Sequence, residues 1–205
     1  MKKVFLEGRD FNRLIEATKG FVSKDDQRQI YRFIKLDVEI SMTRGALVTA
    51  AACDGYRLSV ERARAVQPVD ESFSCYIPVC RNMPANSFVS IELVEVGREN
   101  DVLIRCEDMI FGCRQPKCKE EFVNYEKFFD AKVAFRVAFR PEYLKKALAA
   151  AEASTGNVMA PLVFEFNSPR DPCYIKTGER RENLKMVLPM RIEDGVAYEG
   201  TESTD

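Results

Sequence analysis

The sequence predicts an α+β fold with few helices and much antiparallel sheet. Two helix patterns, over residues 10–20 and 141–154, each follow a short apolar strand and precede runs of period-two alternation. Between them lies a meander of short alternating segments separated by turn residues, which is typical of antiparallel sheet. The layout of residues 3–61 is repeated by residues 133–192 without obvious sequence identity.

The first helix pattern, FNRLIEATKGF, carries apolar or small side chains at the i, i+3, i+4 and i+7 positions of an amphipathic helix. We expect Asp10 to cap its start and Gly20 to end it. A polar loop, SKDDQRQ, follows. Period-two strands are then expected over residues 33–40 and from residue 47 onward, interrupted by an Asp-Gly turn at Asp54.

The middle of the chain predicts further short strands, which read YIPV, FVSIELVEV, DVLIRCED and MIFGCRQP. RNMPANS, at residues 81–87, discourages a helix because it contains Pro84 and Asn86. Residues 116–131 are expected to form a connector. Its aromatic side chains are expected to pack on a sheet; they are Phe122, Tyr125, Phe128 and Phe129.

The last third of the chain repeats the strand–helix–strand order. AFRVAFR alternates, with Phe135, Val137 and Phe139 on one side, and predicts a strand. Pro141 then opens PEYLKKALAAAEAS, the strongest helix pattern of the chain. LVFEFN, PCYIKTG and LKMVLPMRI predict three more strands, and residues 193–205 are expected to form an acidic, disordered tail.

The composition excludes several classes of function. The 205 residues hold 31 Lys and Arg against 32 Asp and Glu, with no His and no Trp. Near-neutral charge argues against a protein that coats nucleic acid through bulk charge. The lack of His excludes Ser-His-Asp and Cys-His catalysis and His-ligated metals. Because the sequence also has no Gly-rich phosphate loop, we expect no enzyme activity, no catalytic residue and no cofactor.

The seven cysteines favour reduced thiols in a cytoplasmic protein. Their number is odd, and we find neither a signal peptide nor an apolar segment long enough to span a membrane. Zinc is the alternative, because Cys106, Cys113 and Cys118 lie close in sequence. No CxxC pair and no His completes such a site, so we expect no metal.

Charge is distributed unevenly along the chain. Residues 1–35 hold nine bases and five acids, whereas residues 193–205 hold five acids and no base. A basic start with an acidic end indicates local attraction for an anionic partner, and a simple solvated surface is the alternative.

Three segments together carry a resemblance to a known family. RLIEATKGFVSKDDQRQIYRF, AAACDGYRLSV and VLPMRI, in this order, resemble the bacterial replicative sliding clamp, the beta subunit of DNA polymerase III. YIPV and EEFVNYEKFF add to it. The resemblance implies the DNA-clamp (processivity) fold. Residues 1–130 then resemble the family's middle domain, and residues 131–192 resemble only the second half of its last domain. Cys53 stands where the family has threonine.

The resemblance implies contact with duplex DNA. Family clamps encircle DNA without reading its sequence, and basic side chains that line the ring meet phosphates, which position without specifying. Solubilising surface charge is the alternative for each residue. The residues at lining positions are Arg13, Lys19, Lys24, Arg28, Tyr31, Arg32, Lys145 and Lys146.

The resemblance also implies a hydrophobic pocket between the family's middle and last domains. This pocket captures short peptide motifs of DNA polymerases and clamp loaders, and it needs apolar walls with a few polar anchors. Ordinary strand core is the alternative for Val187, Leu188 and Met190. The residues at pocket positions are Cys53, Gly55, Tyr56, Arg57, Leu58, Leu188, Pro189, Met190 and Arg191.

Two hypotheses follow from the resemblance. The first is a processivity factor that associates with copies of itself into a ring around DNA. The chain holds three half-units, at 1–62, 72–116 and 133–192, and family rings contain twelve, so we expect a homo-oligomer. The second is a clamp-derived adaptor that binds peptides and does not encircle DNA.

Overall fold

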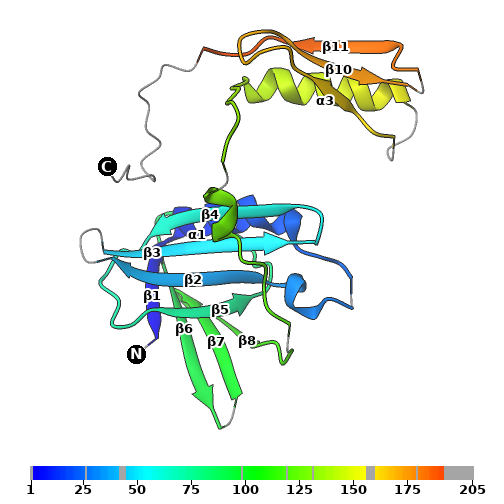
Figure 1. Cartoon of the computed structure of the whole chain (residues 1–205). Helices are drawn as coiled ribbons and strands as arrows, with labels where there is room; N and C mark the ends of the chain where they lie inside the picture. The colour runs from blue at the N-terminus through cyan, green and yellow to red at the C-terminus, as the bar shows by residue number, and fades with distance from the viewer. Residues whose placement is uncertain are drawn as a thin grey trace. The chain divides into compact units, whose positions relative to one another are not determined.

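The computed structural model divides into two compact units, unit 1 (Met1–Asp130) and unit 2 (Ala131–Asp205) (Figure 1). The predicted acidic tail, residues 193–205, lies outside the described residues. The residues that the structure describes are 2–25, 27–41, 45–97, 99–118, 120–130, 132–155, 160–178 and 180–191.

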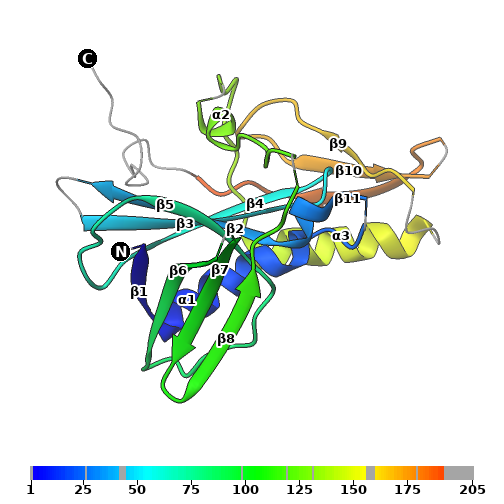
Figure 2. The ribbon, with the colours of Figure 1, turned by 90° about the horizontal axis from the view of Figure 1, so that it is seen from below.

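Two four-stranded antiparallel sheets form unit 1. The first has the order β1-β6-β7-β8, with strands at Lys3–Glu7, Phe88–Val96, Glu99–Cys106 and Met109–Arg114. Figure 2 shows this sheet with β1 and β8 at its edges. The second has the order β4-β3-β2-β5, with strands at Leu58–Arg64, Gly45–Cys53, Ile34–Ser41 and Phe73–Ile77. The predicted meander and the α+β class are confirmed.

Helix α1 (Gly8–Thr18) packs its apolar stripe into one core shared with both sheets. Phe11, Leu14, Ile15 and Thr18 are buried, as the spacing predicts. The first three join a cluster that also takes buried side chains from strands of each sheet. The α-helix ends at Thr18, before the predicted Gly20, because the chain tightens there into the 3-10 turn η1 (Lys19–Phe21).

The start of α1 differs from the prediction. The helix begins at Gly8, so Asp10 is not its cap but lies in the first turn, where a carboxylate faces the positive end of the helix dipole. Backbone groups satisfy the first amides instead. The Gly8 amide donates to the carbonyl of Ser87 at 2.7 Å, and the Arg9 amide donates to that of Ala85 at 3.1 Å.

The segment before β6 forms no helix, as RNMPANS predicts. The Asn12 side chain holds it by two hydrogen bonds, donating to the carbonyl of Met83 at 2.8 Å and accepting from its amide at 2.7 Å. Residues 83–87 therefore seal the N-terminal end of α1, and the carbonyls of Ala85 and Ser87 take the place of a local cap.

The connector after β8 includes a short helix, α2 (Glu126–Phe129). Tyr125 is buried, but Phe128 and Phe129 are 60% and 53% exposed. The expectation that all four connector aromatics pack on a sheet is therefore wrong for Phe128. The Phe129 ring lies 4.6 Å from the guanidinium of Arg62, so a cation rather than apolar core covers it.

Unit 2 contains one helix and one three-stranded sheet among its described residues. Helix α3 (Pro141–Thr155) confirms the predicted helix. The antiparallel sheet has the order β11-β10-β9, with strands at Asn183–Val187, Cys173–Thr177 and Val163–Glu165. The core is small: four residues, Ala151, Cys173, Ile175 and Val187, are buried in the described part of this cluster.

Two strand predictions in unit 2 are wrong. AFRVAFR forms no regular strand, and a single antiparallel bridge joins Ala138 to Met190. The last strand ends at Val187, so Leu188 and Pro189 follow it as irregular chain. A strand needs a neighbour for its backbone groups, and the described part of unit 2 offers AFRVAFR only this one contact. No helix within the described ranges is long and apolar enough to cross a membrane.

Candidate functional site

The turn between β3 and β4 is organised by one carboxylate, Asp54. Its Oδ1 accepts hydrogen bonds from the amides of Tyr56 at 3.0 Å and Arg57 at 2.8 Å. Its Oδ2 accepts from Nε and Nη2 of Arg57, at 2.9 and 2.6 Å. The Arg57 guanidinium and the two amides lower the pKa of Asp54 to about 2, so this carboxylate stays charged at neutral pH.

The same turn requires glycine at position 55. Gly55 has φ +92°, a conformation that costs other residues energy. A Cβ built there would also lie 2.5 Å from a guanidinium nitrogen of Arg28. The absence of a side chain therefore lets Arg28 reach the turn. Arg28 is a residue that the resemblance assigned to DNA, and the structure places it beside residues assigned to the peptide pocket.

A hollow of about 460 Å³ opens beside this turn, and we call it the turn hollow. All five pocket residues predicted on this side line it. Tyr56, at 97% exposure, stands at its rim as a free aromatic surface. The residues that line the turn hollow are Arg28, Tyr31, Cys53, Gly55, Tyr56, Arg57, Leu58, Val123 and Phe128.

Arg28 and Tyr31 line the turn hollow although they were predicted to contact DNA, and two further lining residues, Val123 and Phe128, were assigned to neither site. Both come from the connector, which is anchored to β2 by a nearby polar cluster. The Tyr125 hydroxyl donates to Oδ2 of buried Asp37 at 2.5 Å, and Lys35 lies 3.0 Å from the same oxygen. Burial and the Asp37 carboxylate raise the pKa of Tyr125, so the hydroxyl remains a donor. The aromatic run in the connector was the signal that could have found Phe128.

A second hollow, of about 330 Å³, lies at the end of β11 in unit 2, and we call it the strand-end hollow. Leu188, Pro189 and Met190 line it as predicted, whereas Arg191 is not among its lining residues. Leu188 is 63% exposed and Val187 is buried, so the strand-core alternative holds for Val187 alone. The lining residues that were not predicted are Arg140, Tyr143, Met186 and Val187.

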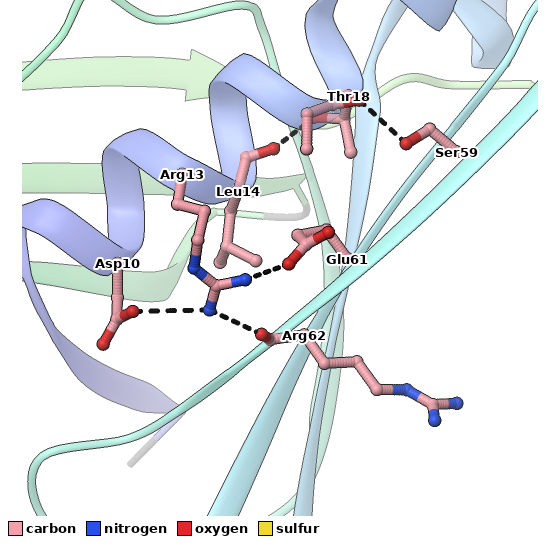
Figure 3. Close-up of polar contacts among 8 residues, drawn as sticks. Asp10, Arg13, Leu14, Thr18, Ser59, Glu61 and Arg62 are labelled. Atoms are coloured by element: carbon pink, nitrogen blue, oxygen red, sulfur yellow. Dashed lines mark hydrogen bonds and ion pairs between the residues drawn. The ribbon is translucent and has the colours of Figure 1, made fainter. Parts of the chain in front are cut away.

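Arg13 is exposed, but acceptors of its own unit engage its guanidinium (Figure 3). Its guanidinium donates to the Glu61 carboxylate, to Oδ1 of Asp10 at 3.3 Å and to the carbonyl of Arg62 at 2.7 Å. These contacts tie α1 to β4 and neutralise the charge. Arg13 therefore contributes to the packing of α1, and its availability to a phosphate is low.

The other predicted DNA residues of unit 1 lie on or after η1. Lys19 pairs with Glu16 at 2.6 Å on the surface of the α1 end. Lys24 is exposed and forms no ion pair with another described residue. Tyr31 and Arg32 lie in the 3-10 turn η2 (Gln29–Arg32). The Tyr31 ring meets the connector ring of Phe122 edge-on, with centroids 5.5 Å apart.

The two predicted DNA residues of unit 2 are neighbours on α3. Lys146 pairs with Glu142 at 2.6 Å, one turn away on the exposed face. Lys145 is exposed on the same helix. An exposed i,i+4 pair contributes only about 0.3–0.5 kcal/mol, so a phosphate can replace the Glu142 carboxylate as the partner of Lys146.

All seven cysteines are free thiols. Burial raises the pKa of Cys75 to about 12 and that of Cys80 to about 11, so both are protonated at neutral pH. Within the residues that the structure covers, no group of three Cys, Asp or Glu side chains could hold a metal ion. Cys53 keeps a local role, because its sulfur accepts the Gly55 amide at 3.3 Å inside the turn.

Comparison with known proteins identifies the fold. No protein-family model and no curated protein matches the sequence. The chain is similar in structure to the DNA polymerase sliding clamp of Bacillus subtilis, with a TM-score of 0.69 and 18% identity, over 93% of this chain and 50% of the clamp. It is also similar to the DNA polymerase III beta subunits of Pseudomonas aeruginosa (TM-score 0.72, 14% identity, 92% and 51% covered) and Streptococcus pyogenes (0.71, 13%, 93% and 51%).

The similarity extends over both units, although the chain spans about half the length of these clamps. Identity below one residue in five means that the likeness lies in the arrangement of strands and helices. The chain therefore has the fold of the bacterial replicative sliding clamp, the beta subunit of DNA polymerase III.

Proposed function

We propose that the protein is a processivity factor of the sliding-clamp type, which holds duplex DNA without sequence specificity and recruits partners through apolar hollows. The single observation that carries this proposal is the clamp fold over 93% of the chain. We infer a non-catalytic, cytoplasmic accessory subunit that works as a homo-oligomer, because the chain has the fold of a sliding clamp.

The segment from η1 to η2 is the proposed DNA-contacting surface. Sliding requires positive side chains that attract phosphates without anchoring to bases. Lys24 is exposed and has no described ion-pair partner, which leaves its ammonium group available to a phosphate. Arg13 is the weaker candidate, because the Glu61 and Asp10 carboxylates already neutralise it.

The turn hollow and the strand-end hollow are the proposed peptide-binding surfaces. Each combines apolar walls with exposed aromatic or aliphatic side chains and at least one arginine, which suits a short peptide with apolar anchors and an acidic group. Arg57 is engaged by Asp54, so Arg28 is the cation that the turn hollow offers to a peptide carboxylate. The partners of this chemistry are motifs of DNA polymerases and clamp loaders.

The salt dependence of DNA binding separates Lys24 from Arg13. Each phosphate contact contributes roughly 0.9 to the slope of log K against log salt, so Lys24→Ala is expected to reduce the slope by about one. Arg13→Ala is the matched control and is expected to leave the slope unchanged. The measurement is fluorescence anisotropy of a labelled duplex oligonucleotide over a series of NaCl concentrations. A slope that Lys24→Ala leaves unaltered would show that this segment does not meet the phosphates.

A further inference from the structure

Unit 1 is built from two half-units that exchange a strand. In the first half-unit, β1 and α1 precede β2, β3 and β4, yet β1 pairs with β6 of the other half-unit. In the second, β5 precedes β6, β7 and β8, yet β5 pairs with β2 of the first. Each four-stranded sheet thus consists of three consecutive strands and one strand received from the other half-unit.

Each exchanged strand also keeps one link to its own half-unit. The amide of Val66, shortly after β4, donates to the carbonyl of Phe5 in β1 at 2.8 Å. After β8, the Gln115 side chain makes the corresponding link by accepting from the Tyr76 amide at 2.7 Å and donating to its carbonyl at 2.8 Å. The exchanged strand is therefore bound along one edge by its own half-unit and along the other by the partner half-unit.

Unit 2 repeats the first half-unit of unit 1 element by element. Residues 134–140 directly precede α3, as β1 directly precedes α1, and β9, β10 and β11 follow as β2, β3 and β4 do. The amide of Met190, shortly after β11, donates to the carbonyl of Ala138 at 2.8 Å. Ala138 lies three residues before the start of α3, and Phe5 lies three residues before the start of α1. The isolated bridge in unit 2 is therefore the counterpart of the Phe5–Val66 link.

Two positions that are filled in unit 1 are open in the described part of unit 2. The edge of β9, the counterpart of β2, receives no strand, and residues 134–140 have no neighbour along their second edge. Val4 and Leu6 of β1 are fully buried, whereas their counterparts before α3, Val137 and Phe139, are only half-buried, and Phe164 on β9 remains 43% exposed. Unit 2 is therefore one half of a two-sheet body, with apolar side chains that its own half-unit does not cover.

We propose that two copies of the chain complete each other by exchanging residues 134–140, so that this segment of each copy becomes the fourth strand beside β9 of the other. The two open positions are complementary. Each copy lacks a strand beside β9, and each copy has a segment, residues 134–140, that can fill this position in the other copy. A two-fold axis satisfies both needs at once with one self-complementary interface. The resulting order, β11-β10-β9 followed by the partner's 134–140, reproduces the order β4-β3-β2-β5 of unit 1.

Charge and register support a second copy as the occupant. In unit 1, Lys3 lies opposite Glu92 across β1 and β6, and the two side chains pair at 3.6 Å. Counting back from the helix starts, Arg136 takes the place of Lys3. Arg136 is exposed and has no ion pair with any residue the structure describes.

The acid that would meet Arg136 is on β9. Phe164 lies opposite core residue Ile175 across β9 and β10, just as Ile91 lies opposite core residue Ile104 across β6 and β7. Aligned on these residues, Glu165 takes the place of Glu92. Glu165 already meets Lys176 at 2.6 Å and Arg181 at 3.7 Å, and a carboxylate can accept a further donor. In the exchanged dimer, Arg136 of each copy therefore faces the partner's Glu165.

The test is the mass of the full chain in solution without DNA, by sedimentation equilibrium over a concentration series. We expect a dimer or a multiple of it for the unchanged chain. Arg136→Glu and Glu165→Arg place like charges opposite each other twice per dimer, so each is expected to weaken dimerisation about tenfold. The double variant R136E/E165R restores opposite charges and is expected to return to within about threefold of the unchanged chain.

Several results would overturn this interface. They are a monomer at high micromolar concentration, single variants that dimerise normally, or a double variant no tighter than the singles. Far-UV circular dichroism of each variant checks that loss of the Lys176 pair has not unfolded unit 2. The proposed interface rests on the homo-oligomer of the proposed function, and its test uses no DNA. It can therefore hold if DNA binding fails, and fail if DNA binding holds.

Discussion

Gly8→Ala is expected to destabilise unit 1 by about 1–3 kcal/mol, the usual cost of forcing one methyl group into a closely packed site. A Cβ at Gly8 would overlap the backbone carbonyl oxygen of Pro84, which cannot rotate away as a side chain does. Relief requires moving residues 83–87 and loses the 2.7 Å hydrogen bond from the Gly8 amide to Ser87. The measurement is the urea midpoint followed by far-UV circular dichroism.

Gly20→Ala is the matched control at the other end of the same helical segment. A Cβ there meets no atom within 4 Å, and Gly20 has no positive φ. This variant is expected to be neutral or slightly stabilising, since alanine reduces the freedom of the unfolded chain. Equal urea midpoints for the two alanine variants would show that residues 83–87 yield easily and do not define the end of α1.

Leu188→Ala is expected to weaken the binding of a clamp-binding peptide at least tenfold. A few side chains near the centre of a recognition surface typically carry most of its binding free energy, about 2 kcal/mol or more each. Leu188 lines the strand-end hollow and is 63% exposed, so its removal takes contact area from a ligand while the unit 2 core is retained. Tyr56→Ala tests the turn hollow by the same reasoning.

The probe is a fluorescein-labelled peptide that carries the clamp-binding motif of a bacterial replicative polymerase, titrated with the full chain. Leu184→Ala is the matched control, because Leu184 is 54% exposed on β11 but does not line the hollow. The same affinity for the Leu188 and Leu184 variants would remove the strand-end hollow as a peptide site.

The sequence was most informative where local pattern and tertiary packing agree. The i, i+3, i+4, i+7 stripe of α1 predicted four of its five buried residues, and Pro141 marked the start of α3. The Asp-Gly pair marked the turn that Asp54 organises. In these places a short segment contains all the groups that decide its conformation.

The predictions failed where a distant segment decides the conformation. The start of α1 depends on residues 83–87, about seventy residues away, which satisfy its first amides in place of Asp10. AFRVAFR has the alternation of a strand, but its backbone lacks a neighbour along one edge within the described part of unit 2. Periodicity reports the preference of a segment, and it cannot report whether a partner strand is present.

The residues that the resemblance assigned to a peptide pocket, apart from Arg191, line hollows, whereas the connector residues of the turn hollow were not predicted. Cys53 through Leu58 and Leu188 through Met190 line the two hollows, apart from Asp54, whose carboxylate holds the turn. Val123 and Phe128 reach the turn hollow because Tyr125 anchors the connector to Asp37, a side-chain contact across eighty-eight positions. No local pattern indicates such a contact.

Strand exchange would leave no half-unit of the chain without a partner half-unit. Two copies joined through unit 2 hold three two-sheet bodies. In this arrangement, the half-unit of unit 2 in one copy pairs only with the half-unit of unit 2 in the other copy. The second half-unit of unit 1 has no helix between β5 and β6. In this arrangement it never has to take the place of a half-unit that contains a helix.

Topological retention on DNA tests the central claim most directly. The full chain is mixed with nicked circular duplex DNA. The mixture is passed over a gel-filtration column at a salt concentration that suppresses electrostatic binding to phosphates. A clamp is expected to elute with the circular DNA and to be released when a restriction enzyme cuts the circle once. Equal retention on circular and linear DNA, or no retention on either, would contradict a ring around DNA and leave peptide capture without encirclement as the function of the fold.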